Sequence, residues 1–350
     1  MKKIITILIG LFVAATTLTG QDFSMKLKNG GNLYFRVIDT LKHEVRLVRM
    51  NSWGDLRVAQ PKGHLDIPAS VVYQKTTYQV TSIGDAVFAD AKELTSVSIP
   101  STVTMIGDRV FQGCTSLTGV VFPAQEPILG VNVFDGCTAL ADISLGSDWQ
   151  SVDFKKFPEN NEITQLYIPA RIRKISNLKR LKSLVTITVD TNNPSFSSTD
   201  GLLYSKNGKV LYACPNAKEG RIDVADGTES IMNGAFAGCS QVTEVALPSS
   251  VHEFSYMEFF SCPLLSCLYL MTEIPPLTAK YNGSTVFALR FASNDTKVFV
   301  PEAAYVRYQN TICNAPGVYV NMQGEQSESL DSSDLTGKKA IAKIKRERKK

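Results

Sequence analysis

The seven cysteines are the side chains of this 350-residue chain whose spacing most directly suggests chemistry. In a secreted protein such a number favours disulfides. However, Cys114 and Cys137 lie 23 residues apart, as do Cys239 and Cys262, which would place each pair in parallel on neighbouring turns of a repeat. Parallel Cβ vectors fit disulfide geometry poorly, so we predict small buried side chains instead. The sequence shows no partner for Cys214, Cys267 or Cys313.

Metal and catalytic sites lack the spacing that they require. No C-x-x-C pair occurs and the only histidines are His43, His64 and His252, so no zinc site is predicted. No G-x-S-x-G, H-E-x-x-H, P-loop or G-x-G-x-x-G element stands in a supporting context. We therefore expect no cofactor and no enzyme, with His64 and His252 as surface or strand residues. A triad assembled from distant residues leaves no motif, so an enzyme stays open as the third hypothesis below.

The cysteine spacing equals the period of a sequence repeat that is predicted to contain one strand per turn. Phe88, Leu94, Val97 and Ile99 each recur as an apolar residue 23 positions later. The L-x-x-L-x-L spacing within this period is typical of leucine-rich repeats. Alternate strand residues point to opposite faces, so Val97 and Ile99 are predicted to lie inside. Stacked turns should then form interior columns, with Phe88 on Phe111.

The period continues beyond the first two turns. Phe134 and Phe157 extend the phenylalanine column, a degenerate turn follows, and the period resumes at Phe236 and Phe259. Glycines such as Gly84 and Gly107 are expected at a corner of each turn. We therefore predict a β-rich right-handed solenoid of leucine-rich repeats of 23 residues, with N- and C-terminal caps.

The predicted domain organisation follows from where this period holds. Lys2 and Lys3 precede an apolar run, Ile4 to Ala15, that is too short to span a bilayer, which indicates a cleaved signal peptide. The length allows two domains, but the repeat favours one elongated unit. The predicted parts are a signal peptide at 1–20, a β-rich N-terminal cap at 21–66, the solenoid at 67–271 with an irregular insert near 191–220, a C-terminal cap at 272–320, and a polar and basic tail, expected to be disordered, at 321–350.

The net charge of +4 comes from the two ends of the chain. Ten of the 37 basic residues lie at Lys2, Lys3 and in Lys338–Lys350, and the rest of the chain holds 27 basic and 32 acidic residues. This part of the chain is mildly acidic, so we predict no basic surface for binding nucleic acid there. The Lys338–Lys350 tail either makes a weak contact with an anionic surface, about 1 kcal/mol per basic residue, or is simply solvated.

The second turn carries a family resemblance. It reads Ile106-Gly107-x-x-x-Phe111-x-Gly113-Cys114-x-x-Leu117-x-x-Val120-x-Phe122-Pro123. This unit resembles the repeat of the BspA-like leucine-rich repeat family, also called the LRR_5 type, over roughly residues 30–310, although the fourth turn lacks the Gly-Cys pair. The resemblance implies a secreted or surface protein of bacteria or some protozoa, with adhesion to host matrix proteins or other cells as its role and no shared catalytic residues.

The candidate binding residues are the outward strand positions, which should form two parallel rows across the stacked strands. Tyr167 and Tyr269 are the aromatic members, and aromatic residues are enriched in binding hot spots. The alternative is that these side chains merely cover the sheet. Gly119, Val121, Ala246 and Cys267 complete the rows. The predicted partner-binding residues are Ser96, Ser98, Asp142, Ser144, Gln165, Tyr167, Thr186, Thr188, Glu244 and Tyr269.

Three hypotheses for function follow. The first is an exported binding protein that engages a protein or glycan on the host or the cell envelope, an adhesin-like role implied by the resemblance. The second is a structural or assembly component of the envelope, and the third is an enzyme. For the first two we expect export to the periplasm, the cell surface or the medium without a transmembrane span, while the sequence carries no signal for an oligomeric state.

Overall fold

Two compact units make up the structure, a computed structural model. One unit ends at Leu181 and the other begins at Lys182, whereas the sequence favoured a single unit. The division falls in the degenerate turn, where the apolar positions come two residues early. The predicted signal peptide, Cys313 and the basic tail lie outside the described residues. The structure describes residues 22–28, 31–49, 60–159, 161–254, 259, 261–274, 280–281, 284–285, 296–304, 307 and 319–320.

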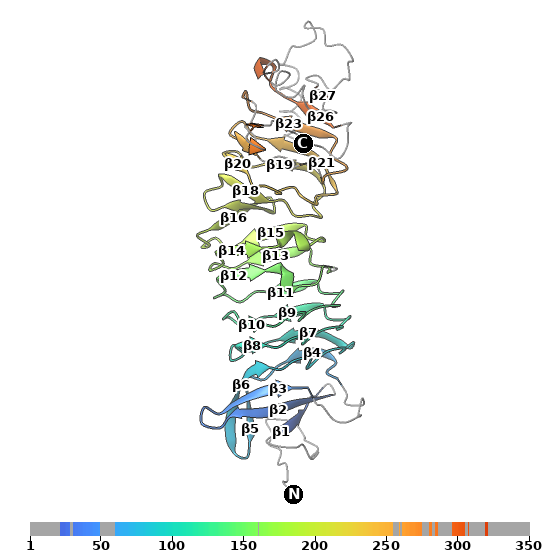
Figure 1. Cartoon of the computed structure of the whole chain (residues 1–350), viewed down its shortest axis with the longest axis vertical. Helices are drawn as coiled ribbons and strands as arrows, with labels where there is room; N and C mark the ends of the chain where they lie inside the picture. Colours follow the sequence, from blue (N-terminus) through green and yellow to red (C-terminus); the bar gives the residue numbers. More distant parts are fainter. Residues whose placement is uncertain are drawn as a thin grey trace. The chain divides into compact units, whose positions relative to one another are not determined.

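The first unit contains two main columns of strands, which Figure 1 shows in blue to green. One sheet has the order β1-β2-β3-β6-β8-β10, with β5 paired to β6, and the other has the order β11-β9-β7-β4. The repeat strands pair in parallel, since the backbone returns to the same side after each turn. The strands are β1 Asp22–Lys26, β2 Asn32–Asp39, β3 Glu44–Val48, β4 Gly63–Asp66, β5 Ser70–Tyr73, β6 Thr76–Ile83, β7 Leu94–Ser98, β8 Met105–Ile106, β9 Gly119–Val121, β10 Ile128–Leu129, β11 Asp142–Ser144, β12 Ser151–Asp153, β13 Gln165–Ile168 and β14 Lys174–Ser176, with the 3₁₀ helices η1 Phe154–Lys156 and η2 Leu178–Arg180.

The second unit also has two main sheets, of orders β16-β17-β18-β20-β22 and β19-β21-β23-β26-β27. Asp200 and Gly201 form the two-residue turn between β16 and β17, as this pair predicts, and both have positive φ. The elements are β15 Thr186–Val189, β16 Phe196–Thr199, β17 Leu202–Ser205, β18 Val210–Ala213, β19 Gly220–Asp223, β20 Ser230–Ile231, β21 Val242–Leu247, β22 Glu253–Phe254, β23 Cys267–Leu270, β24 Lys280–Tyr281, β25 Ser284–Thr285, β26 Lys297–Phe299, β27 Tyr319–Val320 and the 3₁₀ helix η3 Glu302–Ala304.

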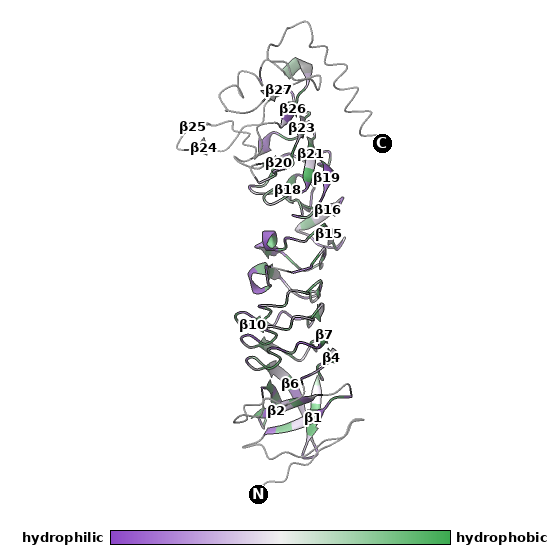
Figure 2. Cartoon of the chain, turned by 90° about the vertical axis from the view of Figure 1, so that its right-hand side faces the viewer, coloured by the Kyte–Doolittle hydropathy of each residue, from purple (hydrophilic) through white to green (hydrophobic). Residues whose placement is uncertain are grey.

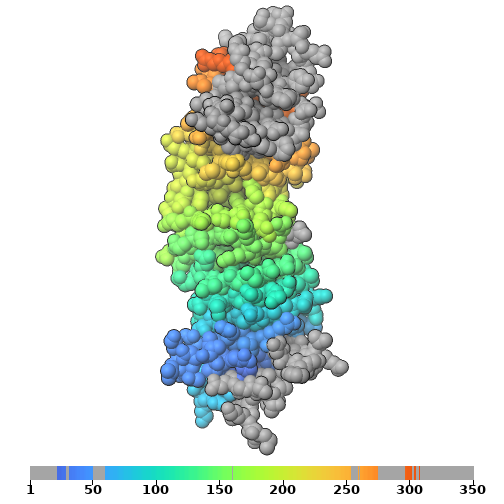
Figure 3. All heavy atoms as spheres, in the orientation of Figure 1, coloured from blue at the N-terminus to red at the C-terminus, as the bar shows by residue number. Residues whose placement is uncertain are grey.

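The pairing register confirms the predicted period and therefore the β-solenoid of leucine-rich repeats. Gly119 of β9 lies opposite Ser96 of β7 on one side and opposite Asp142 of β11 on the other, each one period away along the chain. In the second unit Glu244 of β21 lies opposite Cys267 of β23 at the same separation. Within the first unit, atoms of successive turns pack side by side as bands from blue to green in Figure 3.

The phenylalanine column of the first unit is confirmed as the centre of its core. Ring centroids are 5.4 Å apart between Phe88 and Phe111, 5.4 Å between Phe111 and Phe134, and 5.5 Å between Phe134 and Phe157. The rings stack nearly in parallel, and none is more than 2% exposed. Each turn alone would leave one ring face in water, so the stacking couples the stability of neighbouring turns.

Cys114 and Cys137 lie beneath this column as buried thiols, as predicted. The Cys114 Sγ donates to the Phe88 carbonyl oxygen at 3.1 Å, and the Cys137 Sγ donates to the Phe111 carbonyl oxygen at 3.0 Å. The neighbouring Cys114 thiol, followed by burial, raises the pKa of Cys137 above its ordinary value, so this thiol stays protonated. Their role is to pair carbonyl groups of the preceding turn inside the core.

Glycine is required at one corner because successive turns approach each other closely there. A Cβ atom on Gly130 would lie 2.5 Å from the Gly107 carbonyl carbon. The adjacent aspartates reinforce this corner, since Asp85 Oδ1 accepts from the Asp108 backbone N–H at 2.9 Å and Asp108 Oδ1 accepts from that of Val131 at 3.0 Å. The corner predicted at Gly84 and Gly107 is therefore confirmed.

Gly130→Ala should lower the free energy of unfolding by about 1–3 kcal/mol, because the new methyl group meets backbone that cannot move aside. Gly119→Ala is the matched control, since its Cβ would come no closer than 3.7 Å to another side chain. Native-state hydrogen exchange of the first unit's strand amides should show weaker protection only in Gly130→Ala. Equal protection in both variants would show that the corner has room for a side chain.

Candidate binding face

The outward side chains of the first unit's repeat strands form one surface, here called the strand face. Alternate positions point outward from each strand, and the repeat register places them in rows. The inward residues Val97, Val120 and Ile143 are buried. β13 contacts β11 and continues the rows with its own outward positions. The strand face consists of His64 and Asp66 on β4, Ser96 and Ser98 on β7, Gly119 and Val121 on β9, Asp142 and Ser144 on β11, and Gln165 and Tyr167 on β13.

The six predicted residues of this unit do lie outward. Asp142, Ser144, Gln165 and Tyr167 are exposed, and the two predicted serines on β7 are partly exposed. Tyr167 is the largest of them and leaves 51% of its surface in contact with water. Hydroxyl, amide and carboxylate groups therefore share a surface with one aromatic ring, an arrangement that can both hydrogen-bond a ligand and cover an apolar part of it.

His64 and Asp66 belong to this surface, although they fall in the segment predicted as a cap. β4 pairs with β7 so that His64 lies opposite Ser96, at a separation longer than one period. The period therefore gave no signal for them, because the β5 and β6 hairpin lies between the two strands. Only the alternation His64, Leu65, Asp66 pointed to a strand with one buried face.

The side chains around His64 form a hydrogen-bonded chain of hydroxyl, imidazole and carboxylate. His64 Nδ1 lies 2.7 Å from Ser96 Oγ, and His64 Nε2 lies 3.0 Å from Asp66 Oδ1 and 3.4 Å from Ser98 Oγ. The His64 and Asp66 side chains are 50% and 78% exposed, so water competes for each hydrogen bond and screens the charges. This cluster is suited to exchanging hydrogen bonds with a ligand on the open face.

In the second unit, the predicted exposure of Tyr269 and of Ala246 is wrong. Tyr269 is only 6% exposed, because its ring stacks on Phe299 at 4.8 Å and the Arg221 guanidinium lies 5.0 Å from its centroid. Phe299 belongs to β26, which pairs with β23 and adds a strand to the sheet. Ala246 is fully buried in the same cluster. Of the other predicted residues, Thr188 is exposed, and Thr186 and Glu244 are partly exposed.

Arg221 and Asp223 are outward residues of the second unit that the sequence reasoning missed. Their strand, β19, begins at the last residue of the predicted insert and pairs with β21, which places Arg221 opposite Glu244, one period on. Arg221 forms ion pairs with Asp223 at 3.1 Å and with Glu244 at 3.4 Å. Burial opposes its charge, but the hydrogen bond and the charge of Asp223, together with Glu244, outweigh this and raise the pKa of Arg221.

The residues that could hold a metal do not converge in the described part of the chain. No group of three or more His, Cys, Asp or Glu side chains there has a suitable arrangement. Across the same residues, no helix has the length and apolar character needed to cross a membrane.

Several solved structures resemble this chain at low identity. A leucine-rich cell surface protein from Faecalibacterium prausnitzii is 19% identical over 90% of this chain and 98% of its own, with a TM-score of 0.42. The pneumococcal vaccine antigen PcpA is 16% identical over 85% of this chain and 98% of its own, with a TM-score of 0.44. A leucine-rich repeat protein from Bacteroides ovatus is 20% identical over 77% and 78%, with a TM-score of 0.43. A comparison with curated proteins gives no match.

The repeats themselves give the firmer assignment. The model of the BspA type leucine-rich repeat region matches residues 71–198 and 207–289 in six copies, which is more than half of the chain. The matched ranges contain the phenylalanine column and the Gly-Cys turns described above. The chain therefore belongs to the BspA-type leucine-rich repeat family.

Proposed function

We propose that this chain is an exported, non-enzymatic protein that binds a protein or a glycan through the strand face, in an adhesin-like role. The apolar run after Lys2 and Lys3 supports export. Membership of a family whose repeats present a side-chain surface supports binding. The observation that carries the proposal is the half-exposed Tyr167 among the polar rows of the strand face.

The strand face has the composition of a binding surface. Its exposed groups are mostly hydroxyls, amides and carboxylates, which offer both donors and acceptors to a partner. Tyr167 supplies a rigid ring that buries a large area on contact and has few rotatable bonds, so little conformational entropy is lost. Its contribution to affinity should therefore exceed that of its neighbours. The parallel pairing of β4, β7, β9 and β11 holds their rows in a fixed register, which limits the conformational entropy lost on binding.

Tyr167→Ala should weaken binding at least about tenfold, since truncation of an aromatic anchor typically costs more than about 1 kcal/mol. The full chain is applied to a panel of immobilised, purified matrix proteins and glycans, and the dissociation constant of the retained ligand is measured for the wild type and the variant. Ile128→Ala is the matched control, because Ile128 is 71% exposed but lies on β10, outside the strand face.

An unchanged affinity for Tyr167→Ala, or equal losses in both variants, would exclude the strand face as the binding site. Stable association with envelope components and no retained matrix protein or glycan would favour the structural role instead.

A further inference from the structure

A pocket of about 400 Å³ opens in the first unit, away from the strand face. It lies between the turn containing Asn132 and Thr138, the segment Lys155–Glu159 that begins in η1, and Arg180 at the end of η2. We call it the η1 pocket. Its volume is within the range of small-ligand sites.

The pocket opens where the repeat departs from its pattern. In the preceding turns, Gly113 and Gly136 adopt positive φ and lead into the buried Cys114 and Cys137. Glu159 stands one period after Gly136, so a charged residue replaces the glycine here, and the short helix η1 precedes it at Phe154–Lys156. This turn therefore lacks the glycine that packs closely in the turns before it. Its polar side chains line a hollow against the preceding turn.

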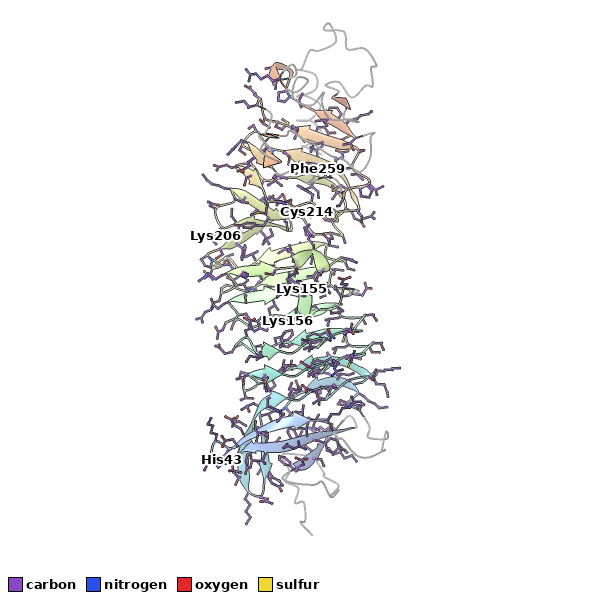
Figure 4. All side chains as sticks on the ribbon, viewed as in Figure 1. His43, Lys155, Lys156, Lys206, Cys214 and Phe259 are labelled. Carbon is purple, nitrogen blue, oxygen red and sulfur yellow. The ribbon has the colours of Figure 1, made fainter. Side chains whose placement is uncertain are left out.

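Three cationic side chains line the pocket. Lys155 and Lys156 end η1 and are labelled in Figure 4; Arg180 occupies the corresponding last position of η2. η1 and η2 read Phe-Lys-Lys and Leu-Lys-Arg, and Figure 2 shows two short coiled ribbons above β10 that carry purple, hydrophilic residues. In the described part of the chain, no carboxylate lies within ion-pair distance of either lysine, and the charge of the nearby Asp153 attracts both. The pocket therefore presents two lysine ammonium groups to whatever enters it.

Arg180 supplies an unused hydrogen-bond donor. Its Nη1 pairs with Glu159 Oε1, while its Nε is buried and has no acceptor among the described residues. A buried donor without an acceptor is destabilising, so an acceptor that reaches Nε from the pocket after a small movement of the Arg180 side chain would be favoured. The opposing carboxylates are Asp135, which accepts from Gln112, and Glu159, which Arg180 already neutralises.

We propose that the η1 pocket binds an acidic sugar through its carboxylate. Lys155, Lys156 and the Arg180 Nε would receive the carboxylate, because charge-assisted hydrogen bonds to a planar anion are the strongest that these groups make. Asn132 and Thr138, both exposed on the opposite wall, offer amide and hydroxyl groups to the sugar hydroxyls. The mixed lining favours a sugar over an acidic peptide, since it combines one cationic wall with one neutral polar wall. This site is independent of the strand face.

The test is calorimetric titration of the full chain with glucuronate, and with glucose as the uncharged sugar. Glucuronate should bind with a dissociation constant of about 1 mM, and glucose should not bind measurably. Lys156→Gln should weaken glucuronate binding about tenfold, and Arg180→Lys, which keeps the charge but removes Nε, should also weaken it. Lys92→Gln makes the same charge change at an exposed turn of an earlier repeat and should stay within about twofold of the wild type.

Five outcomes would overturn the proposal. Equal binding of glucose or absence of glucuronate binding would remove the carboxylate from recognition. An equal loss in Lys92→Gln would show a diffuse charge effect. Inorganic sulfate binding as tightly as glucuronate would show an anion site with no recognition of the sugar. Tighter binding of a glutamate peptide would assign the pocket to a protein partner. Tyr167→Ala, which tests the strand face, should leave glucuronate binding unchanged.

Discussion

Val120→Asp is expected to unfold the first unit or nearly so, whereas Val121→Asp next to it should be almost neutral. Val120 is 2% exposed and faces the core, so its replacement buries a carboxylate with no cationic partner. An uncompensated buried charge costs about 3–5 kcal/mol, a large share of the stability of an ordinary domain. Val121 is 48% exposed, and an outward substitution usually changes stability by less than about 0.5 kcal/mol.

The pair is a matched test because residue type, substitution and strand are the same. Native-state hydrogen exchange of the β7, β9 and β11 amides measures the first unit separately from the second, which a single unfolding curve of the whole chain would not do. Loss of protection in Val120→Asp alone is the expected result. Similar protection in both variants would contradict the assignment of inward and outward positions on β9.

Phe134→Ala should lower the free energy of unfolding of the first unit by about 3–5 kcal/mol. The ring is fully buried between Phe111 and Phe157 and meets Phe122 edge-on at 5.9 Å, so truncation leaves a cavity bounded by three rings. Both neighbouring turns lose a stacking partner, and the loss of hydrogen-exchange protection should therefore extend to strands on either side.

Val131→Ala is the control for this substitution. Val131 lies shortly before Phe134 in the same turn, is 63% exposed, and should change stability by less than about 0.5 kcal/mol. A loss for Phe134→Ala below about 1 kcal/mol would show that the column contributes little to stability.

The fold was predictable because burial repeats at a fixed interval. A turn cannot cover its own apolar face, so Phe88, Leu94 and Val97 must recur where the next turn needs them, and paired strand positions in the structure are separated by this same interval. The same logic placed Cys114 in the core and the outward residues of β11 and β13 on the surface. Within those turns a local pattern is enough to fix each residue's environment.

Burial of Tyr269 could not be predicted because its cause lies outside the period. Phe299 pairs with Tyr269 from more than one period away, through a strand that the sequence assigned to a cap. Alternation correctly placed Tyr269 on the face opposite Leu268, but whether that face meets water depends on this additional strand. The contact between His64 and Ser96 could not be predicted for the same reason, because these residues are also separated by more than one period.

The η1 pocket had no positive sequence signal either. The absent Gly-Cys pair marked the fourth turn as irregular, but an irregular turn can be filled as readily as it can open. The pocket depends on three side chains, Lys156, Glu159 and Arg180. They line the same pocket because η1 and η2 end at corresponding places in adjacent turns.

Binding through the strand face is tested most directly by comparing the full chain with a chain that ends at Gly324, using the matrix protein or glycan that the full chain retains. Both chains should bind with dissociation constants within about threefold of each other and with little dependence on salt, because the strand face carries few charges. Loss of binding with the tail, together with a steep dependence on salt, would assign the interaction to Lys338–Lys350 and contradict a binding role for the strand face.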